Sequence, residues 1–140
     1  MVFVLAPAAG ADIPTLAAIF THAFSNDELS QTFTPPTTDA EKIKARIESR
    51  AERLEHAMKH DPSCRFVKIT DEDTKEIIAF AKWHVPTKEL NVEKFEARFA
   101  EGTNVELIKD FNRRRDAIKE MHLNTETDYC KLYFPSFDYP

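Results

Sequence analysis

The sequence predicts an α+β fold: a single domain over residues 1–140, with a mainly antiparallel sheet of about four strands packed with helices. Its 140 residues fit one domain of ordinary size. A hydrophobic fraction of 42%, with eleven Phe, is enough to form a core. Short β-rich runs alternate with longer segments of helical periodicity, which gives the order β-α-α-β-β-α-α-β and therefore an α+β arrangement.

The first predicted elements are a strand and a helix. Residues 2–5 are a short β-rich run followed by proline and glycine. Asp12 is a suitable N-cap, and apolar residues recur at helical spacing over residues 13–24. Residues 25–36 are polar and end in proline, which predicts a loop.

The longest predicted element is a helix that ends at His60. Thr38 and Glu41 have the spacing of a capping box, and apolar residues then follow every three or four positions. Asp61 and Pro62 stop the helix, because the residue before a proline is biased away from the helical conformation.

The second half of the chain alternates strands with helices. Gly102 breaks one helix, and Thr103 with Glu106 forms a second capping-box pattern that starts the next. The predicted elements are strands at 65–70 and 77–85 joined by an acidic turn at 71–75, helices at 91–100 and 103–122, and a last strand at 129–134.

The composition argues against several classes of function. Two glycines, Gly10 and Gly102, occur where about ten are typical, and neither has a second glycine near it. A loop that wraps a pyrophosphate needs glycines, so the Rossmann and P-loop patterns are absent. The net charge of −5 argues against nucleic acid, and no segment has the ~20 apolar residues of a membrane span. We therefore expect no nucleotide-type cofactor, no nucleic acid and no membrane contact.

Cysteine and histidine spacing predicts no metal site. Cys64 and Cys130 show neither metal-ligand spacing nor a disulfide framework, which suits a reducing compartment and predicts a cytoplasmic protein. His56 and His60 are four residues apart, a spacing that can bind a metal, but no other feature of the sequence supports such a site.

Three stretches of the sequence resemble one family. The opening FVLAPAAGADIPTLAAIFTHAF, the middle DPSCRFVKITDEDTKEIIAFAKWHVP and the end YCKLYFPSFDYP resemble the GNAT acetyltransferase superfamily, in particular its fungal small-molecule members. The resemblance covers nearly the whole chain and implies a strand and two helices before a three-stranded antiparallel meander. In that family a glycine-containing loop after the fourth strand takes the acetyl-CoA pyrophosphate, whereas this sequence stops at 138–140. The resemblance therefore implies the first two-thirds of a GNAT domain, lacking the acetyl-CoA pyrophosphate loop.

The resemblance also implies an open edge on the last strand. In the resembled fold the fourth strand pairs with a fifth, and exposed strand edges are normally covered or paired. Residues 129–140 concentrate five aromatic side chains that favour burial. We expect a second copy of the chain to cover this stretch, which predicts a homodimer through residues 129–140.

The end of the strand at 77–85 carries the candidate catalytic groups. One face turns from apolar to ionisable at Lys82 and His84, as in a core strand that opens into a pocket, and imidazole titrates near neutral pH. If the last strand is its neighbour, Tyr133 can donate a hydrogen bond or act as an acid. The alternatives are that Lys82 and His84 reach solvent past the core and that Tyr133 packs on an edge strand. Alternation places Ile77, Ala79, Ala81, Trp83 and Val85 on one face and Ile78, Phe80, Lys82 and His84 on the other.

Five further residues are candidates for binding a substrate. In the resembled family the neighbourhood of Trp83 borders the acceptor site, and the loop flanked by Phe24 and Phe33 shapes the acceptor pocket. His22 lies at the rim of the first helix, and Arg115 can anchor an acidic ligand. The alternatives are core packing for the three aromatic residues and plain exposure to solvent for the other two.

Three functions are compatible with the sequence. The first is a GNAT-derived protein that binds or transforms a small organic molecule without acetyl-CoA, by proton transfer such as isomerisation, cyclisation, dehydration or decarboxylation. The second is an N-acetyltransferase with a rebuilt acyl-CoA site. The third is a non-catalytic dimeric interaction module. The first is favoured because the ionisable end of the strand at 77–85 is present although the phosphate loop is not.

Overall fold

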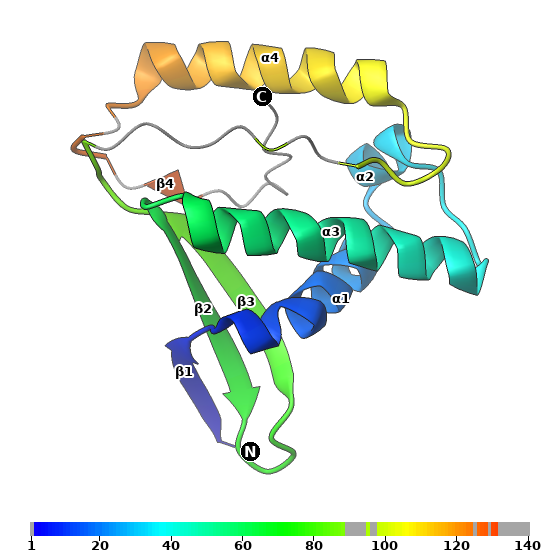
Figure 1. Ribbon diagram of the computed structural model, residues 1–140, viewed down its shortest axis with the longest axis vertical. Helices are drawn as coiled ribbons and strands as arrows, with labels where there is room; N and C mark the ends of the chain where they lie inside the picture. Colours follow the sequence, from blue (N-terminus) through cyan, green and yellow to red (C-terminus); the bar gives the residue numbers. More distant parts are fainter. Residues whose placement is uncertain (1, 89–94, 96–97, 125, 129, 132–140) are drawn as a thin grey trace.

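A computed structural model describes the chain except for residues 1, 89–94, 96–97, 125, 129 and 132–140. In the described part, four strands form one antiparallel sheet in the order β1-β2-β3-β4 (Figure 1). The strands are β1 (Phe3–Pro7), β2 (Cys64–Asp71), β3 (Ile77–His84) and β4 (Cys130–Lys131). The predicted α+β class with an antiparallel sheet is confirmed.

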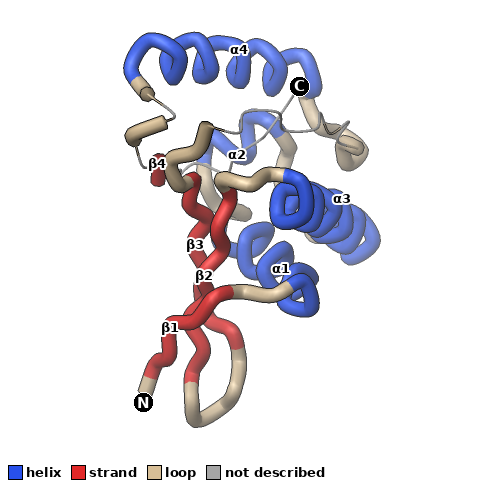
Figure 2. The backbone as a smooth tube through the Cα atoms, turned by 60° about the vertical axis from the view of Figure 1, so that its left-hand side comes forward, coloured by secondary structure: helices blue, strands red, loops and turns tan. Residues whose placement is uncertain are grey.

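Two helices cover one face of the sheet. Helix α1 (Ile13–Ala23) follows a short 3-10 turn, and α3 (Ala40–His60) packs across α1 and against β2 (Figure 2). Both predicted helices are confirmed. Their apolar faces and the sheet form the main core, which consists of Ile13, Leu16, Ala17, Leu54, Ala57, Cys64 and Phe66.

A bulge in the β2–β3 hairpin changes which side chains face this core. The register shifts between Ile69 and Thr70, so Ile78 is an extra residue in β3. Ile77 and Phe80, which simple alternation places on opposite faces, therefore both pack against the main core, and Ile78 is exposed. The face prediction is wrong for Ile77 and Ile78 because a strand with one inserted residue no longer alternates with a period of two.

The segment predicted as a loop at 25–36 contains a short helix, α2 (Glu28–Phe33). The Asp27 side chain caps it by accepting a hydrogen bond of 2.7 Å from the backbone N–H of Ser30. Phe33, at the end of this helix, is 2% exposed and packs with Ile108. The loop prediction is wrong because a local cap and a long-range contact together outweigh the polar composition of the segment.

The caps of the two long helices also differ from the prediction. Asp39, not Thr38, caps α3 by accepting hydrogen bonds from two backbone N–H groups of the first turn. Asn104, not Thr103, caps α4 (Val105–His122) in the same way, with one bond of 3.1 Å. In both cases the cap is the residue directly after the predicted threonine, because its side chain reaches the free N–H groups of the first turn.

Asp12 has a different role from the predicted cap. Its carboxylate makes no capping bond to α1 and instead bridges to Lys68 of β2 at 2.7 Å, while also accepting from the N–H of Ala9 at 2.7 Å. The hydrogen bond from Lys68, followed by that from Ala9, lowers the pKa of Asp12 below its usual value. This ion pair ties the start of α1 to the sheet.

Two predicted elements fall largely outside the described residues. Of the helix predicted at 91–100, residues 91–94 and 96–97 lie outside, and the described residues Phe95 and 98–100 are not helical. Of the last strand, Cys130 and Lys131 are described, and Tyr133 lies outside. The predicted dimer contact through 129–140 is outside the described residues apart from these two.

Helix α4 lies beyond the end of the sheet at which β4 pairs with β3 (Figures 1 and 2). Its buried residue Ile108 forms a second, smaller apolar cluster with Phe33, joined by Phe99 and Phe111. Among the described residues, no helix is both long enough and apolar enough to cross a membrane. The second cluster connects α4 to α2 and leaves open space between α1, α2 and α3.

Candidate functional site

A cleft of about 830 Å³ lies between α1, α2 and α3, with residues 99–103 and Ile108 of α4 closing another side. Its apolar walls include Phe20 and Phe24, whose rings are 4.7 Å apart, and Phe99. Hydroxyl and amide side chains from the α1–α2 connection, from α2 and from residues 34–38 line the rest. The volume falls within the range of small-molecule sites, about 300–1,000 Å³, and the walls mix apolar with polar groups as such sites do.

Three arginines of α3 line one side of this cleft, which we call the arginine cleft. Arg46, Arg50 and Arg53 are spaced by four and three residues, so they share one face of the helix. His22 also lines the cleft, and none of the described lining residues is Asp or Glu. The described lining of the arginine cleft therefore carries three arginines and no carboxylate, although the whole chain carries a net charge of −5.

Neighbouring groups hold the arginines in place. Arg46 donates to the carbonyl of Pro35 at 2.6 Å, and the guanidinium carbon of Arg50 lies 4.0 Å from the centre of the Phe20 ring. Arg53 donates to Ser49 Oγ at 2.9 Å and to the carbonyl of Arg98 at 3.0 Å. Such contacts pre-organise the side chains, which lowers the entropy lost when a ligand binds.

The hydrogen bonding of one nitrogen of Arg46 also bears on the arginine cleft. Its Nε is buried, and no acceptor for it is found among the described residues. A buried N–H group without an acceptor costs about 1–3 kcal/mol, and more when the group is charged. Because this atom is buried, a ligand oxygen can become its acceptor only when the Arg46 side chain shifts toward the ligand.

Two of the predicted substrate-binding residues line the arginine cleft, and three do not. His22 and Phe24 line it. Phe33 packs edge-on against Phe111, with ring centres 5.2 Å apart, as part of the second apolar cluster. Trp83, on β3, is not among the lining residues, and neither is Arg115, which pairs with Asp116 on α4 at 2.9 Å.

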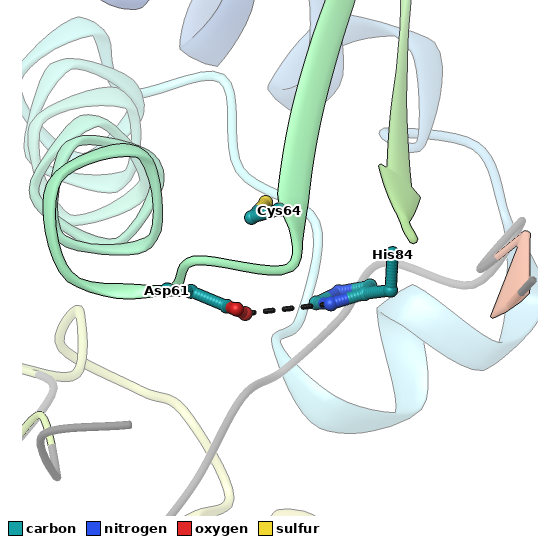
Figure 3. A group of neighbouring side chains, drawn as sticks. All are labelled: Asp61, Cys64 and His84. Atoms are coloured by element: carbon teal, nitrogen blue, oxygen red, sulfur yellow. Dashed lines mark ion pairs between the residues drawn. The ribbon is translucent and has the colours of Figure 1, made fainter. Parts of the chain in front are cut away.

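A second polar group lies at the C-terminal end of α3, where the β2–β3 hairpin ends. Its members are Asp61, Ser63, Cys64 and His84, and we call it the hairpin-end cluster (Figure 3 shows three of them). His84 Nδ1 lies 2.9 Å from Ser63 Oγ and 3.3 Å from Asp61 Oδ2. Ser63 donates to Asp61 Oδ1 from its backbone N–H at 2.9 Å and from its hydroxyl at 2.6 Å.

The cysteine of this cluster is close to the other two ligand-type side chains. One atom each from Asp61, Cys64 and His84 lies within 4.8 Å of the others. Cys64 is 7% exposed, and the side chains of His84 and Asp61 are 19% and 11% exposed. The cluster is thus largely shielded from solvent.

The predicted catalytic residues are not in the arginine cleft. His84 and Lys82 do not line it, and Tyr133 is outside the described residues. Lys82 is 9% exposed and lies opposite Phe66 on the helix-covered face of the sheet. Among the described residues, the structure places Ser63 and Asp61, which were not predicted, beside His84.

The sequence contained a signal for the arginine cleft that the prediction did not use. The spacing of Arg46, Arg50 and Arg53 is visible in the sequence, and it places three cations on one helical face. The hairpin-end cluster had a weaker signal: Asp61 and Cys64 are three apart, but nothing local indicates that His84 lies beside them.

Comparisons with known proteins give little further guidance. No protein-family model matches the chain, and no curated protein matches it. Among solved structures, a crystal structure described as histone acetyltransferase HPA2 and related acetyltransferase, from Corynebacterium glutamicum, is similar with a TM-score of 0.46 and 21% identity. The alignment covers 82% of this chain and 72% of that one.

Proposed function

We propose that the protein binds a small organic anion in the arginine cleft, without acetyl-CoA. The observation that supports this most is the row of Arg46, Arg50 and Arg53 along a cleft of about 830 Å³ with no carboxylate among its described lining residues. Guanidinium groups bind oxyanions through paired, charge-assisted hydrogen bonds, so a carboxylate or a phosphate ester is the matching ligand chemistry.

The apolar wall favours a ligand with a flat or hydrocarbon part. Phe20, Phe24 and Phe99 offer ring surfaces beside the arginines. A ligand with an anionic head and an apolar body can pair the head with the guanidinium groups and bury the body against these rings. This combination separates the proposed ligand from a simple inorganic ion.

The proposal fits the sequence resemblance and adds to it. The resemblance to GNAT proteins implies an acceptor pocket bordered by the loop near Phe24, and Phe24 lines the arginine cleft. Within residues 1–140 the glycines are Gly10 and Gly102, which are too far apart to form a phosphate loop together, and this favours binding without acetyl-CoA in the part of the protein described by this sequence.

Proton-transfer chemistry by His84, with Lys82 and Tyr133, stays a prediction. What favours His84 is its support by a carboxylate and a hydroxyl at Nδ1, the arrangement that orients an imidazole for acid–base work. The imidazole that borders the arginine cleft is that of His22, so His22 is the group placed to exchange a proton with a ligand bound there. The homodimer and the cytoplasmic location also stay predictions.

A calorimetric titration with four small probes tests the binding proposal. Phenyl phosphate and benzoate carry the anion, while benzyl alcohol and benzylamine present the same ring without it. We expect the two anions to bind and the other two to bind at least about tenfold more weakly, because each charge-assisted hydrogen bond contributes about 1.5–3 kcal/mol. Equal affinity for benzylamine would contradict the proposal.

Matched arginine variants locate the site. Arg46→Gln and Arg53→Gln should each weaken phenyl phosphate binding about tenfold or more. Arg113→Gln removes the same charge from an exposed position on α4 that does not line the cleft, so its affinity should match that of the unaltered protein. If Arg113→Gln weakens binding as much as the cleft variants do, the anion is held by general charge and not in the cleft.

A titration with acetyl-CoA tests the second part of the proposal. We expect no binding tighter than millimolar and no acetyl transfer to an amine. Because acetyl-CoA carries phosphates of its own, the titration is repeated with Arg46→Gln, which separates capture in the arginine cleft from binding elsewhere. Tight binding together with acetyl transfer would replace this proposal with the rebuilt acetyltransferase.

A further inference from the structure

We propose that Asp61, Cys64 and His84 bind one zinc ion at the end of the β2–β3 hairpin. The three residues supply oxygen, sulfur and nitrogen, the ligand types that zinc takes in proteins. The site is separate from the arginine cleft, so this inference does not depend on the proposed function. Neither the spacing of the cysteines nor that of the histidines predicts it from the sequence.

Strand pairing places Cys64 and His84 side by side. The two residues are register partners in the antiparallel β2–β3 pair. The backbone N–H of Val85 donates to the carbonyl of Ser63 at 2.9 Å, which makes Ser63–Val85 the hydrogen-bonded pair. Cys64 and His84 therefore form the adjoining non-hydrogen-bonded pair, in which opposed side chains stand on one face and approach most closely.

The chain just before β2 adds the carboxylate. Asp61 follows the last residue of α3, and the turn back into β2 is held by a bond of 3.1 Å from the N–H of Cys64 to the carbonyl of Asp61. Ser63 fixes Oδ1 of Asp61 with its N–H and its hydroxyl, at 2.9 and 2.6 Å. The other oxygen, Oδ2, is thereby turned toward His84. Outer hydrogen bonds that orient a ligating carboxylate are a regular part of zinc sites.

The distances suit a tetrahedral ion after a small adjustment. Two ligand atoms that are each about 2.0–2.1 Å from a tetrahedral zinc lie about 3.3 Å apart. The separation of Asp61 Oδ2 and His84 Nδ1 is 3.3 Å. The Cys64 sulfur lies within 4.8 Å of one nitrogen of His84 and one oxygen of Asp61, so side-chain movements of about 1 Å bring the three ligand atoms to zinc geometry.

The charges also balance. Zinc binds the deprotonated thiol, the carboxylate and the neutral imidazole. The ion's two positive charges thus cancel the two negative charges of Cys64 and Asp61 in a cluster that is largely shielded from solvent. The 3.3 Å separation of Asp61 and His84 is also that of an ordinary ion pair without a metal. The feature that indicates a soft metal such as zinc is the buried thiol of Cys64 beside this pair.

Metal titration of the tag-free chain, after dialysis against a chelator, tests the inference. We expect one zinc per chain, bound with micromolar or tighter affinity by calorimetry and counted by atomic absorption. Cobalt in place of zinc should give a thiolate-to-metal charge-transfer band. Zinc should also protect Cys64 from alkylation by iodoacetamide, a measurement that needs no variant. Failure to bind zinc tighter than about 100 μM, or alkylation that zinc does not slow, would overturn the inference.

Variants assign the ligands. Cys64→Ser should abolish the charge-transfer band, and Cys64→Ser, Asp61→Asn and His84→Gln should each weaken zinc binding at least about 100-fold. Cys130→Ser is the matched thiol control, since Cys130 is the register partner of His84 on its other side. His60→Gln is the imidazole control, from the stacked His56–His60 pair on α3. Both controls should keep the cobalt band. A band that is lost in Cys130→Ser and kept in Cys64→Ser would overturn the assignment, as would zinc binding that depends on His60.

Discussion

The arginine cleft lies along the middle of α3 and the hairpin-end cluster at its C-terminal end, yet the two regions differ in sign of charge and in origin. Arg53 and Asp61 are eight residues apart along α3, which is about 12 Å of helix. The described lining of the cleft is cationic and has no carboxylate, whereas the cluster combines a carboxylate with a thiol. The first suits an anion and the second a cation, so one scaffold helix presents two sites with opposite preferences.

The two regions also differ in what creates them. The arginines share a face because of helical spacing alone, which is local. The cluster depends on long-range strand register, which a bulge alters. At the turn, Asp71 pairs with Glu76. Without the bulge, this register would place Cys64 opposite Trp83. Because Ile78 is an extra residue in β3, Cys64 is instead opposite His84.

The largest effect should come from the core residue that both regions share. Leu54 is 6% exposed on α3, between the cleft and the cluster. Leu54→Ala should lower the free energy of unfolding by about 2–5 kcal/mol, because it removes buried methyl groups and leaves a cavity. Unfolding in urea, followed by circular dichroism, measures the change.

The control for this prediction is Glu52→Ala, at an exposed position of the same helix. Its effect should stay within about 0.5 kcal/mol. If Leu54→Ala lost no more stability than Glu52→Ala, α3 would not be the common support of the two regions.

A pair of serine variants should separate the two regions by function. Ser63→Ala removes the hydroxyl that donates to Asp61 Oδ1 and leaves the backbone N–H bond to the same oxygen, so zinc affinity should fall about tenfold while phenyl phosphate binding is unchanged. Ser49→Ala, which removes the hydroxyl that accepts from Arg53, should weaken phenyl phosphate binding and leave zinc affinity unchanged. Both affinities are measured by calorimetry on each variant. A loss of both affinities in one variant would show that the regions are coupled.

Much of the fold could be predicted because it is encoded locally. The long helix ending at His60 and the two hairpin strands have clear periodicity and clear stop signals, and they are confirmed. Helix α2 was missed because it is six residues long and its stability comes from an Asp27 cap and the burial of Phe33 against α4, which is more than 70 residues away in the sequence.

In the candidate site, too, residues at the end of the first helix were predicted from local sequence, and the partners of His84, which depend on long-range contacts, were not. His22 and Phe24 were predicted to bind a ligand from their place at the end of the first helix, and both line the arginine cleft. Arg115 was also a candidate because it shares a stripe with apolar residues of α4. It pairs with its neighbour Asp116, a contact that helical periodicity does not reveal. The partners of His84 depend on the bulge, and no local pattern in the sequence marks it.

The smallest effect should come from an ion pair outside both regions. Lys68 and Ala9 lower the pKa of Asp12 below its usual 3.8, so the charged carboxylate is favoured in the folded state. A group whose pKa is lowered on folding stabilises the protein above its unfolded pKa, and the contribution is lost as the pH falls through the lower, folded value. Asp12→Asn should therefore reduce stability at pH 7 by at most about 1 kcal/mol, and the difference from the unaltered protein should disappear well below pH 3.8.

Urea unfolding at pH 7 and at successively lower pH measures this difference. Asp110→Asn is the matched control, because Asp110 pairs with Arg113 and Arg114 on the exposed surface of α4 and its loss should leave stability unchanged. Asp12 belongs to neither the arginine cleft nor the hairpin-end cluster, so Asp12→Asn should change neither zinc nor phenyl phosphate affinity. A changed affinity for either ligand would mean that the loss of the Asp12–Lys68 ion pair alters the arginine cleft or the hairpin-end cluster through α1 and the sheet. The two regions would then depend on the contact between α1 and the sheet.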